Sequence, residues 1–471
     1  MAAALALRPA TSETAKQPAQ PAPSTPADRK AHGKRLRDAV PHFAHAAWRA
    51  HADRADPLSI LRAADATRQK RLVPLRYGRM LHSSFTFYRG SAGVMADDLA
   101  RTPAMGIHVQ ACGDAHLMNF GGFGTPERRL IFDINDLDET LPAPWEWDVK
   151  RLVASFVLAA RSNGLSDRDG RDAAVACVAS YRHAMREFAA MDVLDIWYAR
   201  MDDSDFLAML PKGQKTVLSK RIAKARSHSG SELVFPKLAE IDGQDPHIHD
   251  MPPTIFHPDA ATAAGNLALI REALPKYRET LAEDRRVLFD RYRLVDAAVK
   301  VVGIGSVGTL CMILLMMSEA GHPLFLQVKE ANASVLEAHA GKSIHPHHGQ
   351  RVVAGQRLMQ PASDLFVGWV TGPEGRHFYL RQLRDVKLSA LVETYDAEML
   401  TIYAKACGWV LARAHAKAGD PWAISGYLGK GDEFDEAMGR FALGYADQAE
   451  QDHAALKAAV RKGDIEVELE N

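Results

Sequence analysis

The amino-acid sequence predicts an α+β fold built as two lobes. The first half is mainly helical and contains two short strand-like segments, 107–110 and 130–134. A second group of strand-like segments begins near Tyr292, and its members lie at 299–302, 324–329, 366–370 and 377–381. Helical, charged patterns return after about residue 391 and continue to the end. Short apolar runs bounded by turn residues favour strands, whereas apolar positions three and four residues apart favour helices.

The composition is that of an ordinary globular protein and excludes several functional classes. Lys plus Arg and Asp plus Glu number 58 each, so the formal net charge is zero and gives no general attraction to nucleic acid or to an anionic membrane. The four cysteines are scattered without C-x-x-C spacing, which predicts buried free thiols and a reducing compartment. The longest apolar run, Cys311–Met317, is too short to span a bilayer. We therefore expect a cytoplasmic protein with neither a nucleic-acid nor a membrane partner.

The first group of candidate functional residues surrounds the two early strands. Asp114 and Asn119 lie five residues apart on a loop after the first strand, and Asp133 lies at the end of the second. In phosphoryl transfer the attacking hydroxyl must be oriented and lose its proton, while metal ions are held against the phosphate oxygens. A loop aspartate, an asparagine one turn away and a strand-end aspartate can converge on one point for this purpose. The alternative is a loop whose Asp and Asn side chains bond to nearby backbone groups.

An acidic run follows directly, with Asp136, Asp138 and Glu139. Carboxylates this close in sequence repel one another unless a cation or arginines compensate. We predict that Asp136, and with equal weight Asp138, binds a metal or substrate. Exposed carboxylates screened by solvent are the alternative.

The second group of candidates is a glycine-rich segment followed by a strand lysine. Gly303, Gly305 and Gly308 have G-x-G-x-x-G spacing around Ser306, so backbone amides can approach phosphates. A dinucleotide-binding turn would open a helix and be followed by an acid roughly twenty residues on. Here the chain continues as apolar strand residues and reaches Lys329, which suits a phosphate-pairing lysine. A tight hairpin with an edge-strand lysine is the alternative.

These motifs carry a resemblance to known families. Gly113–Asn119, the Asp133 strand and the Trp147-Asp148 helix start resemble the catalytic half of aminoglycoside phosphotransferase and choline kinase-like enzymes. Gly303–Gly308 with Lys329 resemble the nucleotide lobe of the same superfamily. From about Lys34 the chain resembles bacterial domain-of-unknown-function family 2252, which is grouped with kinase-like folds. The segments that match are Cys112–Gly121, Phe132–Ser155, Val301–Thr309, Leu324–Ala331 and Gly349–Gln360.

The resemblance implies a two-lobed protein kinase-like fold that binds ATP and Mg²⁺. It makes Asp114 the catalytic base and Lys329 the contact of the α- and β-phosphates. It implies that Asp148 braces the catalytic loop by accepting backbone hydrogen bonds. The implied metal ligands are Asn119 and Asp133, to which the acidic run adds Asp136 as a candidate. The implied nucleotide-binding residues are Gly303, Gly305, Ser306, Gly308 and Lys329.

The order of the motifs departs from that of kinases, because the catalytic block precedes the glycine-rich segment. A circular permutation explains this order, since it joins termini at the surface without changing the packed core. The helical stretch 403–417 resembles the helix that normally precedes the catalytic loop. The predicted organisation is a disordered tail at 1–30, a catalytic portion at 31–290 with a polar insertion or mobile lid near 212–258, a nucleotide-binding portion at 291–390, and completing helices at 391–471.

Two questions stay open from the sequence. The helix 349–360 contains no acid to pair with Lys329, which leaves Glu337 or Gln356 as candidates. Arg76, Arg79 and Arg89, predicted to lie on loops or strands, are candidates for further phosphate contacts.

We predict an ATP- and Mg²⁺-dependent phosphotransferase that acts on a hydroxyl of an unknown small-molecule acceptor. The alternatives are an inactive nucleotide-binding pseudokinase and a nucleotidyl (AMP) transferase.

Overall fold

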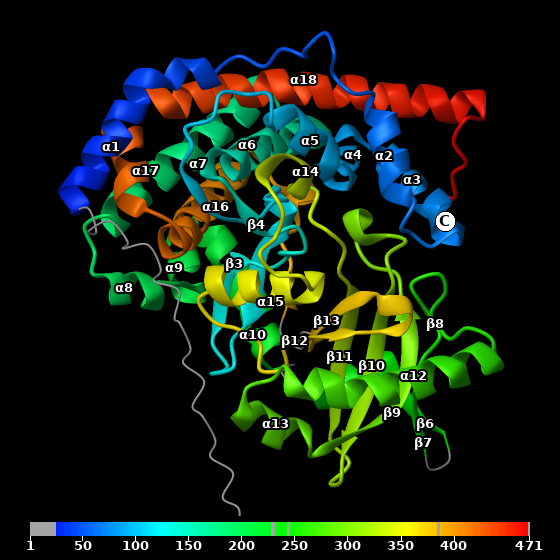
Figure 1. The fold of residues 1–471 in the computed structure, drawn as a ribbon. Coiled ribbons are helices and arrows are strands. Elements are labelled where there is room, and N and C mark those ends of the chain that lie inside the picture. The colour runs from blue at the N-terminus through cyan, green and yellow to red at the C-terminus, as the bar shows by residue number, and fades with distance from the viewer. Residues whose placement is uncertain (1–24, 228–230, 243–244, 384–386, 470–471) are drawn as a thin grey trace, which may run out of the picture.

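The computed structural model describes residues 25–227, 231–242, 245–383 and 387–469. They form an α+β molecule in which a helical lobe lies against a smaller lobe built on a sheet (Figure 1). The predicted α+β class is therefore confirmed. Of the predicted tail at 1–30, residues 1–24 lie outside the described residues, and helix α1 begins at Pro26, so the last part of that segment is helical.

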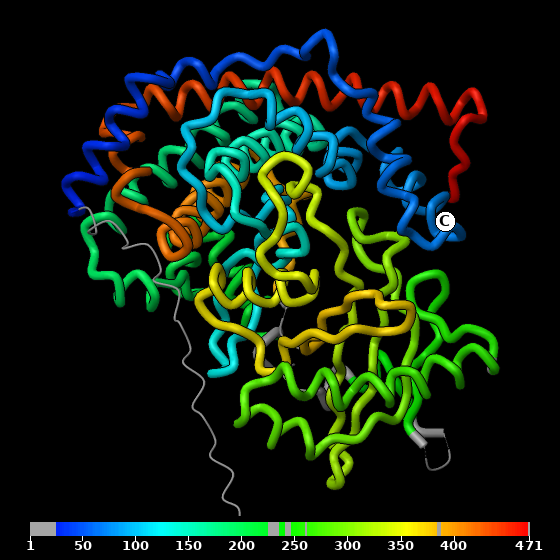
Figure 2. Tube along the Cα trace, viewed as in Figure 1, coloured from blue at the N-terminus to red at the C-terminus, as the bar shows by residue number. Residues whose placement is uncertain are grey.

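The helical lobe is built on three long helices that pack together. Helix α7 (Asp167–Phe188) contacts both α6 (Trp145–Ser162) and α16 (Ala397–Ala418). Helix α18 (Glu433–Lys462) lies along the top of this lobe, beside the N-terminal segments (Figure 2). Fully buried apolar side chains such as those of Phe156, Val178 and Leu411 fill the core between these helices. Burial of such side chains is the main favourable contribution to the stability of the lobe.

Short helices complete this lobe. Four of them precede the first strand in the sequence: α2 (Pro57–Asp65), α3 (Val73–Leu81), α4 (Ser84–Gly90) and α5 (Ala92–Leu99). The others are α8 (Val193–Tyr198), α9 (Asp203–Ala208) and α17 (Pro421–Leu428). The prediction of loops or strands around Arg76–Met80 and Phe85–Gly90 is wrong, because these residues lie in α3 and α4. The Ser83 hydroxyl accepts a hydrogen bond from the Thr86 amide and caps α4, a local signal that favours a helix.

Two small antiparallel strand pairings position the candidate catalytic loops. Strand β1 (His108–Ala111) pairs with β4 (Leu141–Pro144), and β2 (Phe120–Gly124) pairs with β3 (Leu130–Ile134). The loop after β1 and the loop before β4 therefore leave the same end of the β1–β4 pair. Asp114 lies in the first loop and Asp136 in the second. Strands β14 (Lys387–Leu388) and β5 (Met201–Asp202) flank the β2–β3 pair.

The smaller lobe is a six-stranded antiparallel sheet in the order β12-β13-β11-β10-β9-β8. Helix α12 (Ala260–Glu279) contacts β9 and β12, and helix α15 (His348–Met359) contacts β12 and β13. Leu314, Leu326 and Leu380 belong to the apolar core of this lobe, with Tyr277 of α12. The strands are β8 (Ile255–Phe256), β9 (Tyr292–Lys300), β10 (Cys311–Ser318), β11 (Pro323–Glu330), β12 (Gly368–Thr371) and β13 (His377–Gln382).

The segment predicted as a polar insertion contains regular structure where it is described. It includes α10 (Lys212–Ser227), α11 (Ser231–Leu238) and the hairpin of β6 (Ala239–Asp242) and β7 (Asp245–Ile248). Its end, β8, pairs with β9 at the edge of the large sheet. Residues 228–230 and 243–244 of the predicted insertion lie outside the described residues. Helix α13 (Glu283–Phe289) belongs to the smaller lobe, whereas α14 (Glu337–Ala340) contacts β4 of the larger lobe.

Two predictions from composition can be compared with the structure. All four cysteines are free and buried, as expected. Among the described residues, no helix combines the length and apolar character needed to cross a membrane.

Candidate active site

The loop after β1 is held by the start of helix α6. The Asp148 carboxylate accepts hydrogen bonds from the amides of Cys112 (2.6 Å) and Gly113 (2.9 Å), and His415 of α16 lies 3.1 Å from the same carboxylate. The bracing role predicted for Asp148 is confirmed. Gly113 has a φ of +83°, and a Cβ there would lie 2.4 Å from the Glu139 carbonyl oxygen. Glycine is thus required where the two loops touch.

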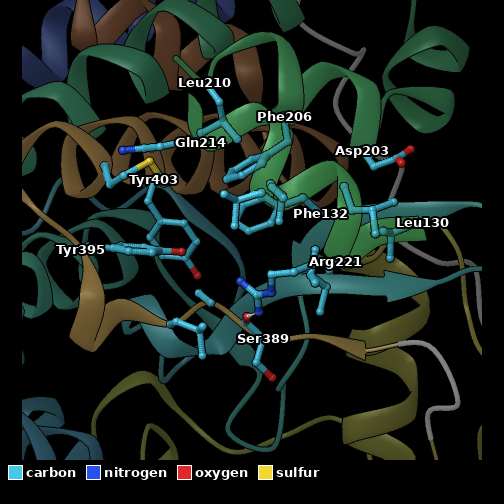
Figure 3. A pocket seen from close by; sticks show the side chains of 18 of the residues that line it. Leu130, Phe132, Asp203, Phe206, Leu210, Gln214, Arg221, Ser389, Tyr395 and Tyr403 are labelled. Atoms are coloured by element: carbon cyan, nitrogen blue, oxygen red, sulfur yellow. Dashed lines mark hydrogen bonds between the residues drawn. The ribbon is translucent and has the colours of Figure 1, made fainter. Parts of the chain in front are cut away.

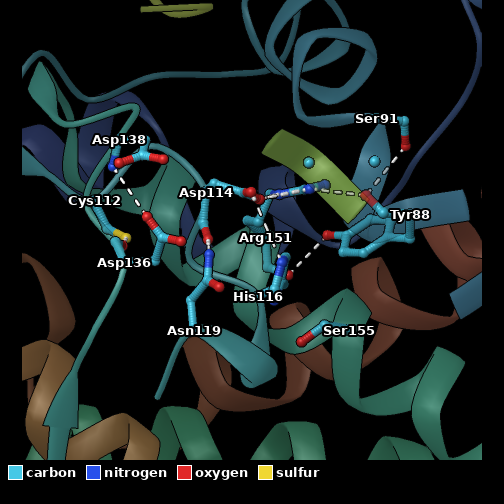
Figure 4. A network of polar contacts seen from close by, with 12 residues as sticks. Tyr88, Ser91, Cys112, Asp114, His116, Asn119, Asp136, Asp138, Arg151 and Ser155 are labelled. Atoms are coloured by element: carbon cyan, nitrogen blue, oxygen red, sulfur yellow. Dashed lines mark hydrogen bonds and ion pairs between the residues drawn. The ribbon is translucent and has the colours of Figure 1, made fainter. Parts of the chain in front are cut away.

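Asp114 is oriented by a buried arginine. Arg151 of α6 donates from Nε to Asp114 Oδ1 (2.7 Å), with Nη2 2.6 Å from the same oxygen. Arg151 also donates to the Tyr88 carbonyl (2.8 Å), and the Tyr88 hydroxyl donates back to the Arg151 carbonyl (2.7 Å) (Figure 4). Asn119 Nδ2 donates to the Asp114 backbone carbonyl (2.7 Å). The loop is thus fixed at both positions, and Asn119 keeps its side-chain oxygen for a ligand.

The acidic loop before β4 meets the strand lysine. Lys329 Nζ on β11 lies 2.5 Å from Asp138 Oδ2 and 3.7 Å from Asp136 Oδ2. The Tyr379 hydroxyl of β13 donates to Asp138 Oδ1 (2.5 Å). Burial alone would raise the pKa of Asp138, but the Lys329 ammonium and these hydrogen bonds lower it to about 2. Burial and the neighbouring Asp138 charge raise the pKa of Asp136. Asp138 is therefore the ionised partner of Lys329, and Asp136 is the carboxylate without a hydrogen-bonded cation.

The glycine-rich segment joins β9 to β10 and is clamped by the N-terminal helices. Arg68 donates to the carbonyls of Gly305 (2.9 Å) and Val307, and Arg79 donates to the Val302 carbonyl (2.7 Å). Ser306 Oγ lies 3.4 Å from Asp138 Oδ2. The segment is thereby fixed between the N-terminal helices and the acidic loop.

A single cleft of about 1080 Å³ between the lobes brings most of these residues together. The predicted residues that line it are Asp114, Asn119, Asp136, Gly303, Gly305, Ser306 and Lys329. Gly308, with a φ of +89°, packs beside Arg68 and is not part of the lining. Arg89 also lines the cleft. Its Nε is buried without a hydrogen-bond partner among the described residues, and burial lowers its pKa.

The structure does not bring Asp133 to the cleft. Both of its carboxylate oxygens accept from Arg413 Nη2 at 2.8 Å, and both side chains are completely buried. A metal ion at Asp133 would have to displace this ion pair in the core of the large lobe. Asp136, three residues later, is the aspartate that lies in the cleft beside Lys329.

The partner of Lys329 also differs from both sequence candidates. Asp138 and Asp136 pair with the lysine, while Glu337 lies 3.7 Å from Lys342. The acidic run in the sequence marks Asp138 but does not connect it with Lys329. Tyr379 lies on a predicted strand and carries no other sequence signal. The pairing arises because Lys329 and Tyr379 face each other in the β11–β13 register.

The donors in the cleft fit a magnesium ion whose remaining ligands come from a phosphate group. Mg²⁺ prefers oxygen ligands and is usually held by one or two carboxylates plus substrate phosphates. Asp136 and the side-chain oxygen of Asn119 supply this chemistry. No group of three or more His, Cys, Asp and Glu side chains suited to a metal ion occurs in the described ranges.

Comparison with known proteins places the chain in a family. Residues 68–459 match the family described as "Uncharacterized protein conserved in bacteria (DUF2252)". Because this match spans most of the chain, the protein belongs to that family. Neither the curated proteins nor the solved structures contain a match.

Proposed function

We propose that the protein is an ATP- and Mg²⁺-dependent phosphotransferase of circularly permuted kinase-like fold. The observation that carries the proposal is the pairing of Lys329 with Asp138 and Asp136 in one cleft. The glycine-rich segment and Asp114 line the same cleft. A lysine on a central strand, a preceding glycine-rich turn, an acidic metal site and a loop aspartate are the parts from which kinases build phosphoryl transfer.

The strand connections support the permuted arrangement. A hairpin, β9–β10, carries the glycine-rich turn, and β11 beside it carries Lys329. Helix α15, strands β12 and β13 and then helix α16 follow in sequence, which is the order of a kinase nucleotide lobe leading into its catalytic lobe. The catalytic loop that should come after α16 instead lies at residues 112–119. Tyr403 of α16 donates to the carbonyls of Leu117 (3.0 Å) and Phe120 (2.9 Å), so the two segments are adjacent in space.

The proposed roles follow from the contacts of each side chain. Asp114, held by Arg151, orients the acceptor hydroxyl and takes its proton. Lys329 neutralises phosphate oxygens of ATP. Asp136 and Asn119 would hold Mg²⁺, which neutralises the charge that develops on the phosphates. Catalysis of this kind depends on positioning and electrostatic stabilisation.

The acceptor that we propose is a small molecule with a hydroxyl group. This choice rests on the resemblance of the Gly113–Asn119 block to small-molecule kinases. The polar lining of the cleft is compatible with it, because Asp114 and Arg89 offer both signs of charge near the reacting group.

Two alternatives remain tied to particular observations. A pseudokinase is favoured by the fact that Lys329 pairs with Asp138 and not with a helix glutamate. Nucleotidyl transfer is favoured by Arg68, which lines the cleft beside the glycine-rich segment, since an extra cation there would suit an inverted nucleotide.

Labelled ATP separates the three functions. The full chain is incubated with Mg²⁺, a panel of hydroxyl-bearing metabolites and either γ- or α-labelled ATP. Phosphotransfer moves only the γ label, nucleotidyl transfer moves only the α label, and a pseudokinase binds ATP and moves neither. Asp114→Asn serves as the matched control, because it keeps the size of the side chain and removes the base. Transfer that persists in this variant would contradict the proposed role of Asp114.

A further inference from the structure

A second cavity lies in the large lobe, lined by residues of the β2–β3 hairpin, of α9 and α10, and of the segment 388–403. It has a volume of about 340 Å³, within the size range of small-molecule sites. The sheet residues Leu130 and Phe132 form one wall, Phe206 of α9 and Leu210 form the next, and α10 closes it (Figure 3). Tyr395 and Met399 complete the lining from the side of α16. Its walls are thus mainly aromatic and aliphatic, with Asp203 at the start of α9 as the one carboxylate in the described lining.

One cationic side chain projects into this apolar cavity. Arg221 of α10 is half-buried and donates from Nη2 to the Ser389 carbonyl (3.0 Å). Within the part of the chain that the structure describes, no carboxylate pairs with it. Most other arginines in the large lobe have such a partner, as Arg182 does with Asp435 and Arg161 does with Asp167. Arg221 therefore has guanidinium donors available at the cavity wall.

The chemistry of this cavity indicates which class of ligand it would bind. A planar carboxylate can take two parallel hydrogen bonds from one guanidinium, and an apolar body gains free energy by leaving water for the aromatic walls. We propose that this cavity is a binding site for a small amphipathic carboxylate. Its carboxylate pairs with Arg221 and its apolar body lies against Phe132 and Phe206.

The cavity adjoins the catalytic cleft but does not depend on it. Ser389 and Ala390 line both cavities, so the ligand would lie beside the proposed active site. Binding of a carboxylate can be measured without ATP or a phosphoryl acceptor. The proposal therefore stands or falls independently of the proposed phosphotransfer.

The test is calorimetric titration of the full chain with dodecanoate, below the concentration at which micelles form. Saturable binding of one dodecanoate per chain is expected. Arg221→Gln should weaken it about tenfold or more, because a charge-assisted bidentate pair is lost. Lys220→Gln, which removes the same charge from the neighbouring exposed position of α10, should change the affinity by less than about twofold.

Two further measurements distinguish recognition of the carboxylate from non-specific hydrophobic binding of the alkyl chain. Dodecanol, which lacks the carboxylate, should bind the wild-type chain about tenfold more weakly and should be insensitive to Arg221→Gln. Val217→Glu places a negative charge on an exposed lining residue and should also weaken dodecanoate binding, whereas Val217→Lys should not. Equal affinity for the two ligands, or equal binding by wild type and Arg221→Gln, would overturn the proposal. So would the absence of saturable binding. Circular dichroism verifies that each variant is folded.

Discussion

Lys329 Nζ lies 2.5 Å from Asp138 Oδ2, although the two residues are 191 positions apart in the sequence. This contact joins the central strand of the smaller lobe to the acidic loop of the larger one. It fixes the distance between the lobes at the point where we propose that phosphates bind. We therefore expect the same contact to contribute to stability and, if the proposed function holds, to nucleotide binding.

Removing Lys329 should reveal both contributions. Lys329→Met leaves the largely buried Asp138 carboxylate without its cation, so the free energy of unfolding should fall by about 3 kcal/mol. Nucleotide affinity should fall as well. Urea unfolding measures the first effect and calorimetric titration with Mg·ATP the second. The double variant Lys329→Met/Asp138→Asn should recover much of the stability but none of the affinity. Additive losses of stability in the double variant would argue against coupling of the pair.

Asp114→Asn should affect turnover far more than binding. Loss of a general base costs about a hundredfold to ten-thousandfold in rate. The proposed contacts of Lys329 and the glycine-rich segment with ATP would remain. Single-turnover kinetics and nucleotide titration provide the two readouts. Because Arg151 loses its charged partner, the unfolding free energy should also fall, by about 1 to 3 kcal/mol. Assays are therefore run at a temperature where the variant is fully folded.

Asp133 and Asp136 should behave in opposite ways. Asp133→Asn leaves the completely buried Arg413 uncompensated and should lower the unfolding free energy by about 3 kcal/mol or more. Asp136→Asn removes a like charge beside Asp138, so stability should change by less than about 1 kcal/mol while Mg²⁺-dependent nucleotide binding is lost. Urea unfolding and Mg²⁺ titrations of both variants decide the matter. A stable Asp133→Asn protein with impaired Mg²⁺ dependence would return the metal role to Asp133.

Asp133 and Asp136 show which features of the site local sequence patterns determine. Spacing correctly marked a cluster of acids after the second strand, and it brought Asp114, Asn119, Gly305 and Lys329 into one predicted site. It could not select among the acids, because both faces of β3 are buried and the choice depends on Arg413, 280 positions away. Such long-range pairing leaves no trace in local patterns.

The N-terminal helices show a second limit of sequence reasoning. Arginines in Arg76–Met80 and Phe85–Gly90 suggested loops, but Arg76 is buried and donates to Asp65 (2.7 Å) and to the Gly90 carbonyl (3.0 Å). A charged residue that is satisfied internally can occupy a core position of a helix. The clamp of Arg68 on the glycine-rich segment was also missed, because its acceptors are backbone carbonyls that have no sequence signature.

If the proposed phosphotransfer holds, Arg89 should assist it from the N-terminal helical segment. Its guanidinium lines the cleft and has no ion-pair partner among the described residues, so a phosphoryl group would be its natural counter-charge. Arg89→Met should reduce the transfer rate about a hundredfold, and Arg89→Lys should restore part of it. Arg71→Met, at an exposed position of the same N-terminal segment, is the control. Equal rates for the Arg71 and Arg89 variants would exclude a role for Arg89 at the phosphates.

The edge of the large sheet should give the protein a measurable pH dependence. His257, directly after β8, lies 3.2 Å from Asp296 of β9 and 2.8 Å from Asp250. The hydrogen bond to Asp296, with support from Asp250, raises the pKa of His257 to about 9. Because the folded protein holds this proton more tightly than the unfolded chain, the stabilisation is complete below about pH 6.5 and disappears as the pH rises through 9.

This pH dependence can be assigned to His257 by substitution. The unfolding free energy of the wild type should fall by about 1.5 kcal/mol between pH 6.5 and pH 9, after a reduction for solvent screening of the partly exposed ring. In His257→Gln this part of the slope should vanish, whereas the exposed His82→Gln should retain it. Urea unfolding at the two pH values measures the difference. If the pH dependence of the unfolding free energy is the same in His257→Gln as in the wild type, another group titrates. The ion pair of His257 would then not stabilise the pairing of β8 with the sheet.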